Sequence, residues 1–411
     1  MKKFKQYLKE DVGVEKLTHL AHLEDMPIID GRDGAAKVLS ILNALISKAK
    51  GVETQHIDIT TKWDGSPSII CGTDPSNGKF FVATKSIFNK LDPKVNYTSE
   101  DIKDNHIQPE LQKKLEYCLK YLKELHIKNI IQGDLLFVEG DVKKKEVDGV
   151  ESFVFRPNTI TYVVPVDSEL GKKIAKAKVG IVFHTRYRGT DLHNLRASLD
   201  VDTTILKKTP DVWFENSDFQ MIKSDEEEKI SPERIKIIEK DMNNLKFALD
   251  SLDKVFLDKV ESDSELKNLL LEFINYLVKT DSNNLPAKQK LELFAKYLID
   301  KYSYTADERK TEKGKTTVSK KLERIQKIVK SNLKMFVILF AVHRIISDVK
   351  LQLIRGIKQK DDIKSYIDID DKLVKSNPEG FVAVSDSYGT VKLNDRDTFN
   401  KHNFNLKKNW D

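Results

Sequence analysis

The sequence predicts an α+β fold in which a sheet-based domain is interrupted by an all-α insertion. Short β-rich runs between residues 54 and 195 are separated by turn signals such as Asp-Gly and Pro-Ser-Asn-Gly. From residue 231 the apolar residues recur at spacings of 3 and 4, which is helical. Strand-like sequence returns at 380–392 as a hairpin. A hairpin does not form a domain alone, so we expect it to rejoin the first sheet.

The first region is predicted to hold a helix at 34–49, six strands, and a second helix at 109–125 among the strands. The six strands are expected at 56–61, 68–71, 80–84, 129–138, 159–164 and 179–185. Short strands separated by turn signals are typical of a sheet-based α+β domain.

The helical region opens at Ser231-Pro232-Glu233, an N-cap, a first-turn proline and an acidic first-turn residue. One apolar seam follows, made of Ile238, Met242, Leu245, Leu249, Leu252 and Phe256. Further helices are predicted at 264–279, 287–302 and 318–355. We therefore expect a helical entry segment at 1–53, a catalytic-type domain from 54–230 and 371–411, and a helical insertion at 231–370.

Composition narrows the class of protein. The chain has 411 residues, a net charge of +6 and two cysteines, Cys71 and Cys118. Two thiols give neither a disulfide framework nor a cysteine-based zinc site, which fits a reducing cytoplasm. The longest apolar run, at 335–342, is too short to span a bilayer, so no membrane partner is expected.

The most informative motif is Thr61-Lys62-Trp63-Asp64-Gly65-Ser66. A lysine amine can attack the α-phosphate of a nucleoside triphosphate, and a glycine turn lets backbone and phosphate approach closely. A plain turn with a solvated lysine is the other interpretation of these residues. Attack requires the neutral amine, so Lys62 needs cations or burial nearby.

Further motifs follow in order along the chain. They are Phe81-Val-Ala-Thr-Lys85-Ser86, Gly133-Asp134 within an apolar strand, Val179-Gly-Ile-Val-Phe183-His184, Glu379-Gly380-Phe381-Val382, and Val391-Lys392. A carboxylate within an apolar strand is costly unless it has a partner, which favours a functional Asp134.

With Lys62-x-Asp64-Gly65 first, this series resembles the covalent nucleotidyltransferase superfamily of ATP-dependent DNA and RNA ligases and mRNA capping enzymes. Within that superfamily it is similar to an uncharacterised group encoded by large tailed phages. The resemblance covers about 54–195 and 376–396 and implies a ligase-type nucleotidyltransferase domain with antiparallel sheets. It does not extend to the helical insertion.

The resemblance implies a role for each matched position. Lys62 would carry the nucleotide as a phosphoramidate, with Thr61, Asp64 and Gly65 beside it. The other implied roles are a ribose contact for Lys85, a ribose or metal contact for Asp134, base stacking for Phe183, metal positioning for Glu379, and α-phosphate neutralisation for Lys392.

Two positions depart from the superfamily pattern. Asp134 stands where glutamate is usual, and Asn394 stands where a second lysine often follows Lys392. Arg396 or Lys85 are candidates to supply the missing charge. For Phe183 and Lys85, plain core packing and an exposed strand end are the competing interpretations.

The implied activity is that of an ATP-dependent polynucleotide ligase, closer to RNA than to DNA ligases, that activates a 5′-phosphate end. It would use ATP with Mg²⁺ or Mn²⁺, and RNA or a nicked duplex as partner, in the host cytoplasm if the chain is phage-encoded. The alternatives are a GTP-dependent capping-type enzyme and a non-catalytic nucleotide-binding phage structural or accessory protein. A kinase-like enzyme ranks lower, because no glycine-rich phosphate loop is evident.

Two further clusters carry weaker hypotheses. A basic stretch around Lys313, Lys315, Lys320, Lys321 and Arg324 is a candidate nucleic-acid contact, with a solvated helix face as its alternative. His19, His22, Glu24 and Asp25 are metal-capable types, for which polar packing is the favoured interpretation.

Overall fold

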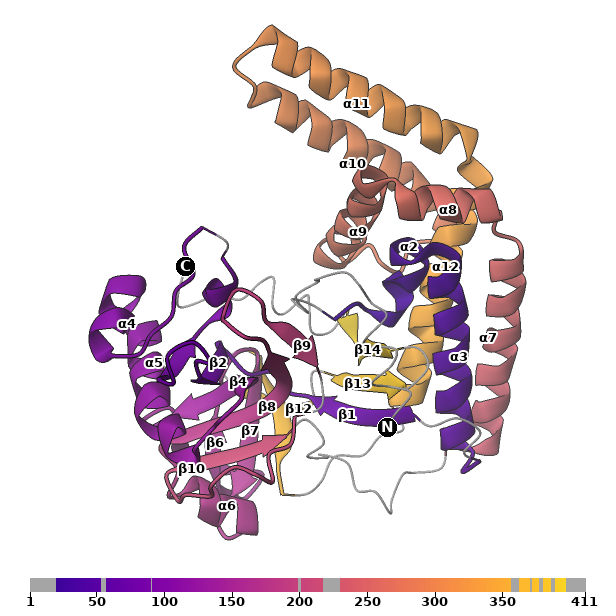
Figure 1. Ribbon diagram of the computed structural model, residues 1–411. Coiled ribbons are helices and arrows are strands. Elements are labelled where there is room, and N and C mark those ends of the chain that lie inside the picture. Colours follow the sequence, from indigo (N-terminus) through magenta and orange to yellow (C-terminus); the bar gives the residue numbers. More distant parts are fainter. Residues whose placement is uncertain are drawn as a thin grey trace.

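The structure is a computed structural model that describes residues 20–52, 57–89, 91–198, 201–216, 230–355, 362–369, 372–376, 380–385 and 389–396. Helices and strands occupy different regions, and most strand pairs are antiparallel, so the α+β prediction is confirmed. Figure 1 shows two sheets with a few helices beside them on one side, a larger block of helices on the other, and a small sheet of β1, β13 and β14 between them.

The small sheet, here called sheet A, joins distant parts of the chain. Its strand order is β1 (Ile57–Lys62), β13 (Gly380–Ser385) and β14 (Gly389–Asn394), all antiparallel. The hairpin predicted at 380–392 is therefore present and pairs with β1, but the three strands form a sheet separate from the other predicted strands.

Sheet B has the order β10-β8-β4-β2-β3, with β9 on the edge of β8. Its strands are β2 (Ser68–Thr73), β3 (Phe80–Ala83), β4 (Ile130–Val138), β8 (Val179–Arg188), β9 (Arg196–Ser198) and β10 (Val212–Asn216). Around it lie η2 (Lys85–Phe88), α4 (Ser99–Asn105), α5 (Pro109–Leu122) and η3 (Lys123–Leu125). The α5 side chains Leu115, Cys118 and Leu122 share a core with one face of sheet B.

Sheet C has the order β12-β11-β7-β6-β5. Its strands are β5 (Lys143–Val147), β6 (Val150–Phe155), β7 (Ile160–Pro165), β11 (Lys364–Ile369) and β12 (Lys372–Ser376), and α6 (Glu169–Ile174) follows β7. An aromatic core of Trp63, Phe137, Phe155, Tyr162 and Trp213 joins sheets B and C. Strand β11 lies within the segment assigned to the helical insertion (231–370) but pairs with β7 across some 200 residues, so the end of that segment belongs to sheet C.

The helical block begins near the N-terminus and continues after residue 231. It contains η1 (Leu23–Asp25), α2 (Met26–Ile29), α3 (Gly31–Ala49), α7 (Pro232–Asp250), α8 (Lys254–Ser262), α9 (Ser264–Lys279), α10 (Ala287–Asp307), α11 (Glu312–Ser331) and α12 (Leu333–Ile354). Apolar side chains of α3, of α7–α12 and of sheet A form one core. No described helix is long and apolar enough to cross a membrane.

Two long predicted helices are each divided in the structure. The seam from Ile238 to Phe256 spans α7 and α8, because Asp253 caps α8 by accepting hydrogen bonds from the backbone N–H groups of Val255 and Phe256. The helix predicted at 318–355 is α11 followed by α12, with a break at Asn332. In both cases the apolar period continues through the break, so periodicity alone does not reveal it.

Candidate active site

Lys62 is the last residue of β1 and the first residue of a loop that crosses to sheet B. Its backbone pairs with Gly380 of β13. The loop is clamped to β4, since Ser66 N donates to Leu135 O at 2.8 Å and Leu135 N donates to Pro67 O at 3.1 Å. Trp63 is buried in the core between sheets B and C, with its ring centroid 5.3 Å from that of Tyr162. The loop therefore holds Lys62 at a fixed position between sheets A and B.

The Asp64 carboxylate anchors this loop from the inside. It accepts hydrogen bonds from Asn158 Nδ2 at 2.8 Å and from the backbone N–H groups of Thr159 and Ile160, each at 2.7 Å. Its own backbone N–H donates to the Tyr162 hydroxyl at 2.8 Å. Asp64 is only 4% exposed, so its role is to fix the loop to β7 rather than to contact a nucleotide, which corrects the expectation from the motif.

Gly65 is required because it lies directly against Asp134. A Cβ atom at Gly65 would lie 2.6 Å from Asp134 Cβ and 2.9 Å from Leu135 O. Real Cβ atoms do not approach other atoms this closely, so any side chain would push the loop off β4. The glycine thus brings the Lys62 loop and the Asp134 strand into contact.

Asp134 lies close to His184 and near two lysines. His184 Nε2 is 3.5 Å from Asp134 Oδ1, and the two side chains are 29% and 26% exposed, so a ligand can reach both. Burial alone would raise the pKa of Asp134, but His184, Lys62 and Lys85 together hold that pKa below its usual value. Gly65 and His184 therefore lie against Asp134, and Lys62 and Lys85 lie near enough to act on its charge.

Asp134 and Phe183 lie on opposite faces of sheet B. A Cβ atom at Gly133 would be 2.9 Å from Phe183 Cδ1, so Gly133 and Phe183 share a face and Asp134, the next residue, points the other way. Phe183 is fully buried beside α5. The expectation that Phe183 stacks on a base does not hold. His184, which follows it, was missed as a site residue although it belongs to the same motif.

Sheet A presents Lys392 on the same face as Lys62. Gly380 pairs with Lys62 and with Asn394, and Val382, two residues on, pairs with Lys392. Side chains of paired and alternate residues share a face, so Lys392 lies diagonally from Lys62 across β13. Thr61 has the opposite orientation, is 2% exposed, and faces the helical core, which does not fit a nucleotide contact.

Glu379 lies outside the described residues, although the next residue, Gly380, pairs with Lys62. Among the described residues there is no group of three or more His, Cys, Asp or Glu side chains that is arranged to hold a metal ion. Asp134 is a carboxylate that lies near enough to Lys62 for the two charges to interact.

The N-terminal segment fixes β14 through a buried polar network. Lys392 N donates to Ala21 O at 2.9 Å, and His22 Nδ1 lies 2.8 Å from Asn394 Oδ1. Asp25 accepts from Arg396 Nη1 and lies 3.1 Å from His343 Nε2, while Lys350 Nζ donates to Glu24 at 2.7 Å.

These contacts explain the metal-capable residues near the N-terminus. Glu24 and Asp25 are paired with Lys350 and Arg396 of the helical block and of the segment after β14, so polar packing is their role. His19 lies outside the described residues. Arg396 is bound to Asp25, which does not fit the expectation that it replaces a second lysine after Lys392; Lys85 is the other residue expected to do so.

A cavity of about 850 Å³ lies against the loop that follows Lys62, but the candidate catalytic side chains do not line it. Ser66, Pro67 and Asn158 form part of its wall, and Lys114 and Arg156 add positive charge. Arg156 is paired with Asp368 at 3.5 Å. Lys62, Lys85 and Asp134 are not among the residues that line it, so the cavity adjoins the site without being part of it.

With this geometry described, the chain can be compared with known proteins. A model for a "Family of unknown function (DUF6267)" matches residues 17–408, nearly the whole chain. The chain belongs to this family. Comparisons with curated proteins and with solved structures found no match.

The basic residues that the sequence suggested as a nucleic-acid contact all lie on α11, far along the chain from Lys62. Lys313 and Lys320 are exposed, and Lys315 pairs with Glu312 one turn away at 3.3 Å. Lys321 and Arg324 are instead directed to carboxylates of α9, which does not fit the expected contact with nucleic acid.

Proposed function

We propose that the chain is a covalent nucleotidyltransferase, in which Lys62 accepts a nucleoside monophosphate from ATP and passes it to the 5′-phosphate of a polynucleotide. The observation that carries this proposal is the convergence on Asp134: Lys62 and Lys85 are both close enough to lower its pKa, and Gly65 lies against it. The ligase-type fold belongs to the same proposal. It is supported by the position of Lys62 between sheet A and sheet B.

In the first step the Lys62 Nζ lone pair attacks the α-phosphorus. The Nζ–P bond forms, the bond from the α-phosphorus to the bridging oxygen breaks, pyrophosphate leaves, and the amine loses a proton to solvent. In the second step a 5′-phosphate oxygen attacks the same phosphorus: the O–P bond forms, the P–Nζ bond breaks, and Lys62 Nζ takes up a proton from solvent as it leaves. The product is a polynucleotide with an activated 5′ end.

The other residues supply charge and position. Lys85 and Lys392 would neutralise phosphate oxygens, and His184, 3.5 Å from Asp134, would donate a hydrogen bond. A divalent cation, when bound, would neutralise the phosphates as pyrophosphate leaves, and Asp134 is the described carboxylate suited to hold it. Asp64 and Gly65 act on the loop, by anchoring it and by letting it approach β4.

The direct experiment is covalent labelling with α-labelled ATP and, separately, α-labelled GTP in the presence of Mg²⁺ or Mn²⁺. We expect an acid-labile, protein-bound label on the wild type and none on Lys62→Ala. Lys79→Ala, which removes an exposed lysine before β3, is the matched control and should label fully. Label on Lys62→Ala, or no label on the wild type with either nucleotide, would exclude the mechanism. The preferred nucleotide separates the ligase-type from the capping-type reaction.

One observation favours a second candidate, a nucleotide-binding protein without turnover that serves as a phage structural or accessory component. Asn394 occupies the place of a second lysine and is paired with His22, and Arg396 is bound to Asp25. The α-phosphate would then meet fewer positive charges than in active relatives of the superfamily. Saturable ATP binding that depends on Lys62 without any covalent label would identify this function.

A further inference from the structure

The positive charge of the chain is concentrated in one helical hairpin, residues 287–331, here called the arm. It comprises α10, the connection at 308–311 and α11. The arm has 13 lysines and arginines against 6 aspartates and glutamates, a net charge of +7, whereas the whole chain has +6. The remaining residues are therefore nearly neutral. Figure 1 shows α10 and α11 extending beyond the other helices, with α11 on the outer side.

Three lysines of α11 form a row on its outer face, with Glu323 between the second and the third. Lys313, Lys320 and Lys327 are seven residues apart, which is two helical turns, so they lie in line at intervals of about 10 Å. All three are exposed. Val318 and Ile325, five residues after Lys313 and Lys320, are buried in the core on the opposite side. The row therefore faces solvent along most of the helix.

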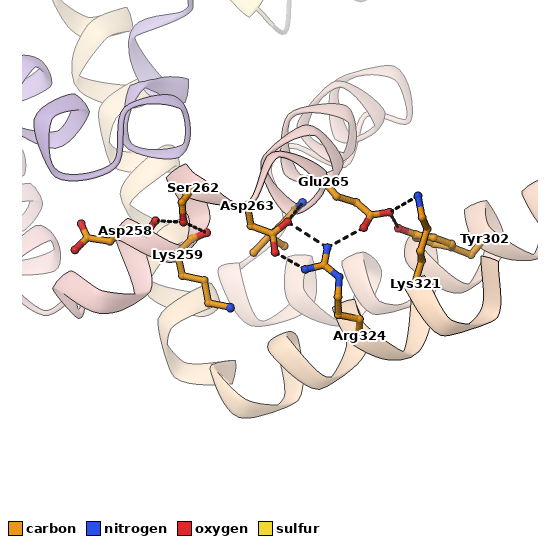
Figure 2. A network of polar contacts seen from close by, with 9 residues as sticks. Asp258, Lys259, Ser262, Asp263, Glu265, Tyr302, Lys321 and Arg324 are labelled. Carbon is orange, nitrogen blue, oxygen red and sulfur yellow. Dashed lines mark hydrogen bonds and ion pairs between the residues drawn. The ribbon is translucent and has the colours of Figure 1, made fainter. Parts of the chain in front are cut away.

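Two other cations of α11 brace the arm instead. Figure 2 shows Arg324 and Lys321 directed toward Asp263 and Glu265 at the start of α9. Arg324 Nη1 lies 2.5 Å from Asp263 Oδ2 and Nη2 lies 2.8 Å from Glu265 Oε2, while the Tyr302 hydroxyl of α10 donates to Glu265 Oε1 at 2.9 Å. Hydrogen bonds from Arg324 hold the pKa of Asp263 below its usual value. This network fixes α11 to α9 and α10, so the lysine row is presented on a rigid support.

We propose that the outer face of α11, through Lys313, Lys320 and Lys327, binds the sugar-phosphate backbone of a polynucleotide. This inference rests on the proposed function, for which the polynucleotide is the acceptor of the nucleotide from Lys62. Lysines at intervals on a helix about 30 Å long match a linear polyanion, whose binding releases condensed counterions and needs no base contact.

A nucleic acid fits this surface better than an anionic membrane does. A helix that binds in the membrane interface needs an exposed apolar face beside its basic one. The apolar stripe of α11, which includes Val318, Ile325 and Val329, is buried in the core of the helical block. The exposed face of α11 can therefore make electrostatic contacts but cannot insert.

The test compares two triple variants with the same change in charge. The first is Lys313→Gln, Lys320→Gln and Lys327→Gln. The matched control is Lys236→Gln, Lys240→Gln and Lys246→Gln, three exposed lysines of α7 in the same block. Glutamine and lysine have similar helix propensities, so both variants should fold, which circular dichroism checks. Binding is measured by fluorescence anisotropy of a labelled RNA strand and of a labelled nicked DNA duplex, at salt concentrations from about 50 to about 200 mM. Each probe is about 30 nucleotides long, so that it exceeds the length of α11.

We expect the α11 triple to bind at least about tenfold more weakly at the lowest salt than the wild type, and its salt slope on duplex to be shallower by about three. The α7 triple should match the wild type within about twofold, and the α11 triple should still accept label at Lys62. Equal weakening of both triples, or wild-type binding that salt does not affect, would overturn the inference. So would lysine-dependent binding to phosphatidylserine vesicles without binding to nucleic acid. Labelling at Lys62 reports on the proposed function independently of this result.

Discussion

Arg396 donates from one guanidinium nitrogen to both carboxylate oxygens of Asp25, at 2.9 and 3.0 Å, across 371 positions of the chain. The two side chains are 5% and 7% exposed. Arg396 also donates to Asn275 of α9 at 2.8 Å. The end of sheet A is thus tied to the N-terminal segment and to the helical block at one buried point, two residues after the strand that carries Lys392.

Loss of this pair should destabilise the protein strongly. Arg396→Met keeps the apolar stem but leaves the buried Asp25 carboxylate without its main counterion, and we expect a loss of about 3–5 kcal/mol in the free energy of unfolding. Arg32→Met is the matched control, because Arg32 makes an Arg–Asp pair with Asp258 in which both side chains are about half exposed. It should cost no more than about 1 kcal/mol. Urea unfolding measures both, and similar losses in the two variants would contradict this account.

The same buried network should make stability depend on pH. Burial, reinforced by the positive charges of Arg396 and Lys350, lowers the pKa of His22 from 6.5 to about 4. Between these values the unfolded chain binds the proton and the folded chain does not, so stability falls as pH falls from about 6.5 toward about 4. A pKa shift of this size corresponds to a loss of about 3 kcal/mol in the free energy of unfolding across that range of pH. The Glu24 carboxylate affects stability only at lower pH. Burial alone would raise its pKa, but the charge of Lys350 lowers that pKa from 4.5 to about 2.

The variant His22→Gln isolates this contribution. It removes the titrating group, so its stability should change less between about pH 7 and about pH 5 than that of the wild type, even if it is less stable throughout. Urea unfolding at several pH values gives both slopes. Equal slopes would show that His22 is not the group responsible.

The glycine of the Lys62 loop gives a prediction about the contact with β4. In Gly65→Ala the new methyl would meet Asp134 Cβ at 2.6 Å, so the loop must shift away from β4, at a cost of about 1–3 kcal/mol and with loss of labelling at Lys62. Gly314→Ala in α11 is the control, because its nearest neighbour is the Thr311 hydroxyl at 3.0 Å and alanine favours a helix. Full labelling of Gly65→Ala would show that the loop tolerates the shift.

Much of the fold could be predicted from local pattern, and the rest depends on contacts between distant segments. The strands at 68–73 and 130–138 and the helix at 264–279 have clear periods and were predicted closely. Strand β5, which reads Lys-Lys-Lys-Glu-Val, has no apolar alternation because it is an exposed edge strand. Strand β11 is short and becomes a strand by pairing with β7.

Part of the candidate site could also be predicted from the sequence. The resemblance indicated Lys62, Gly65, Lys85 and Asp134, and these residues lie near one another in the structure. Alternation in a strand shows which residues share a face but not which face meets a ligand, so Thr61 and Phe183 were assigned to the site although they face a core. The anchoring role of Asp64 depends on the backbone of residues 159 and 160, which no local pattern reveals.

The opposite orientations of Phe183 and His184 give a test of which side of sheet B binds the nucleotide. Phe183→Leu should lower the free energy of unfolding by about 1–2 kcal/mol, because it truncates a fully buried ring, and should leave the nucleotide concentration needed for half-maximal labelling unchanged. His184→Ala removes a part-exposed group beside Asp134, so it should reduce labelling at Lys62 about tenfold or more, with a stability change within about 1 kcal/mol. Labelling titrations and urea unfolding of the two variants separate these effects. The reverse pattern, a nucleotide defect in Phe183→Leu and normal labelling in His184→Ala, would place the nucleotide on the α5 side and remove Asp134 from the site.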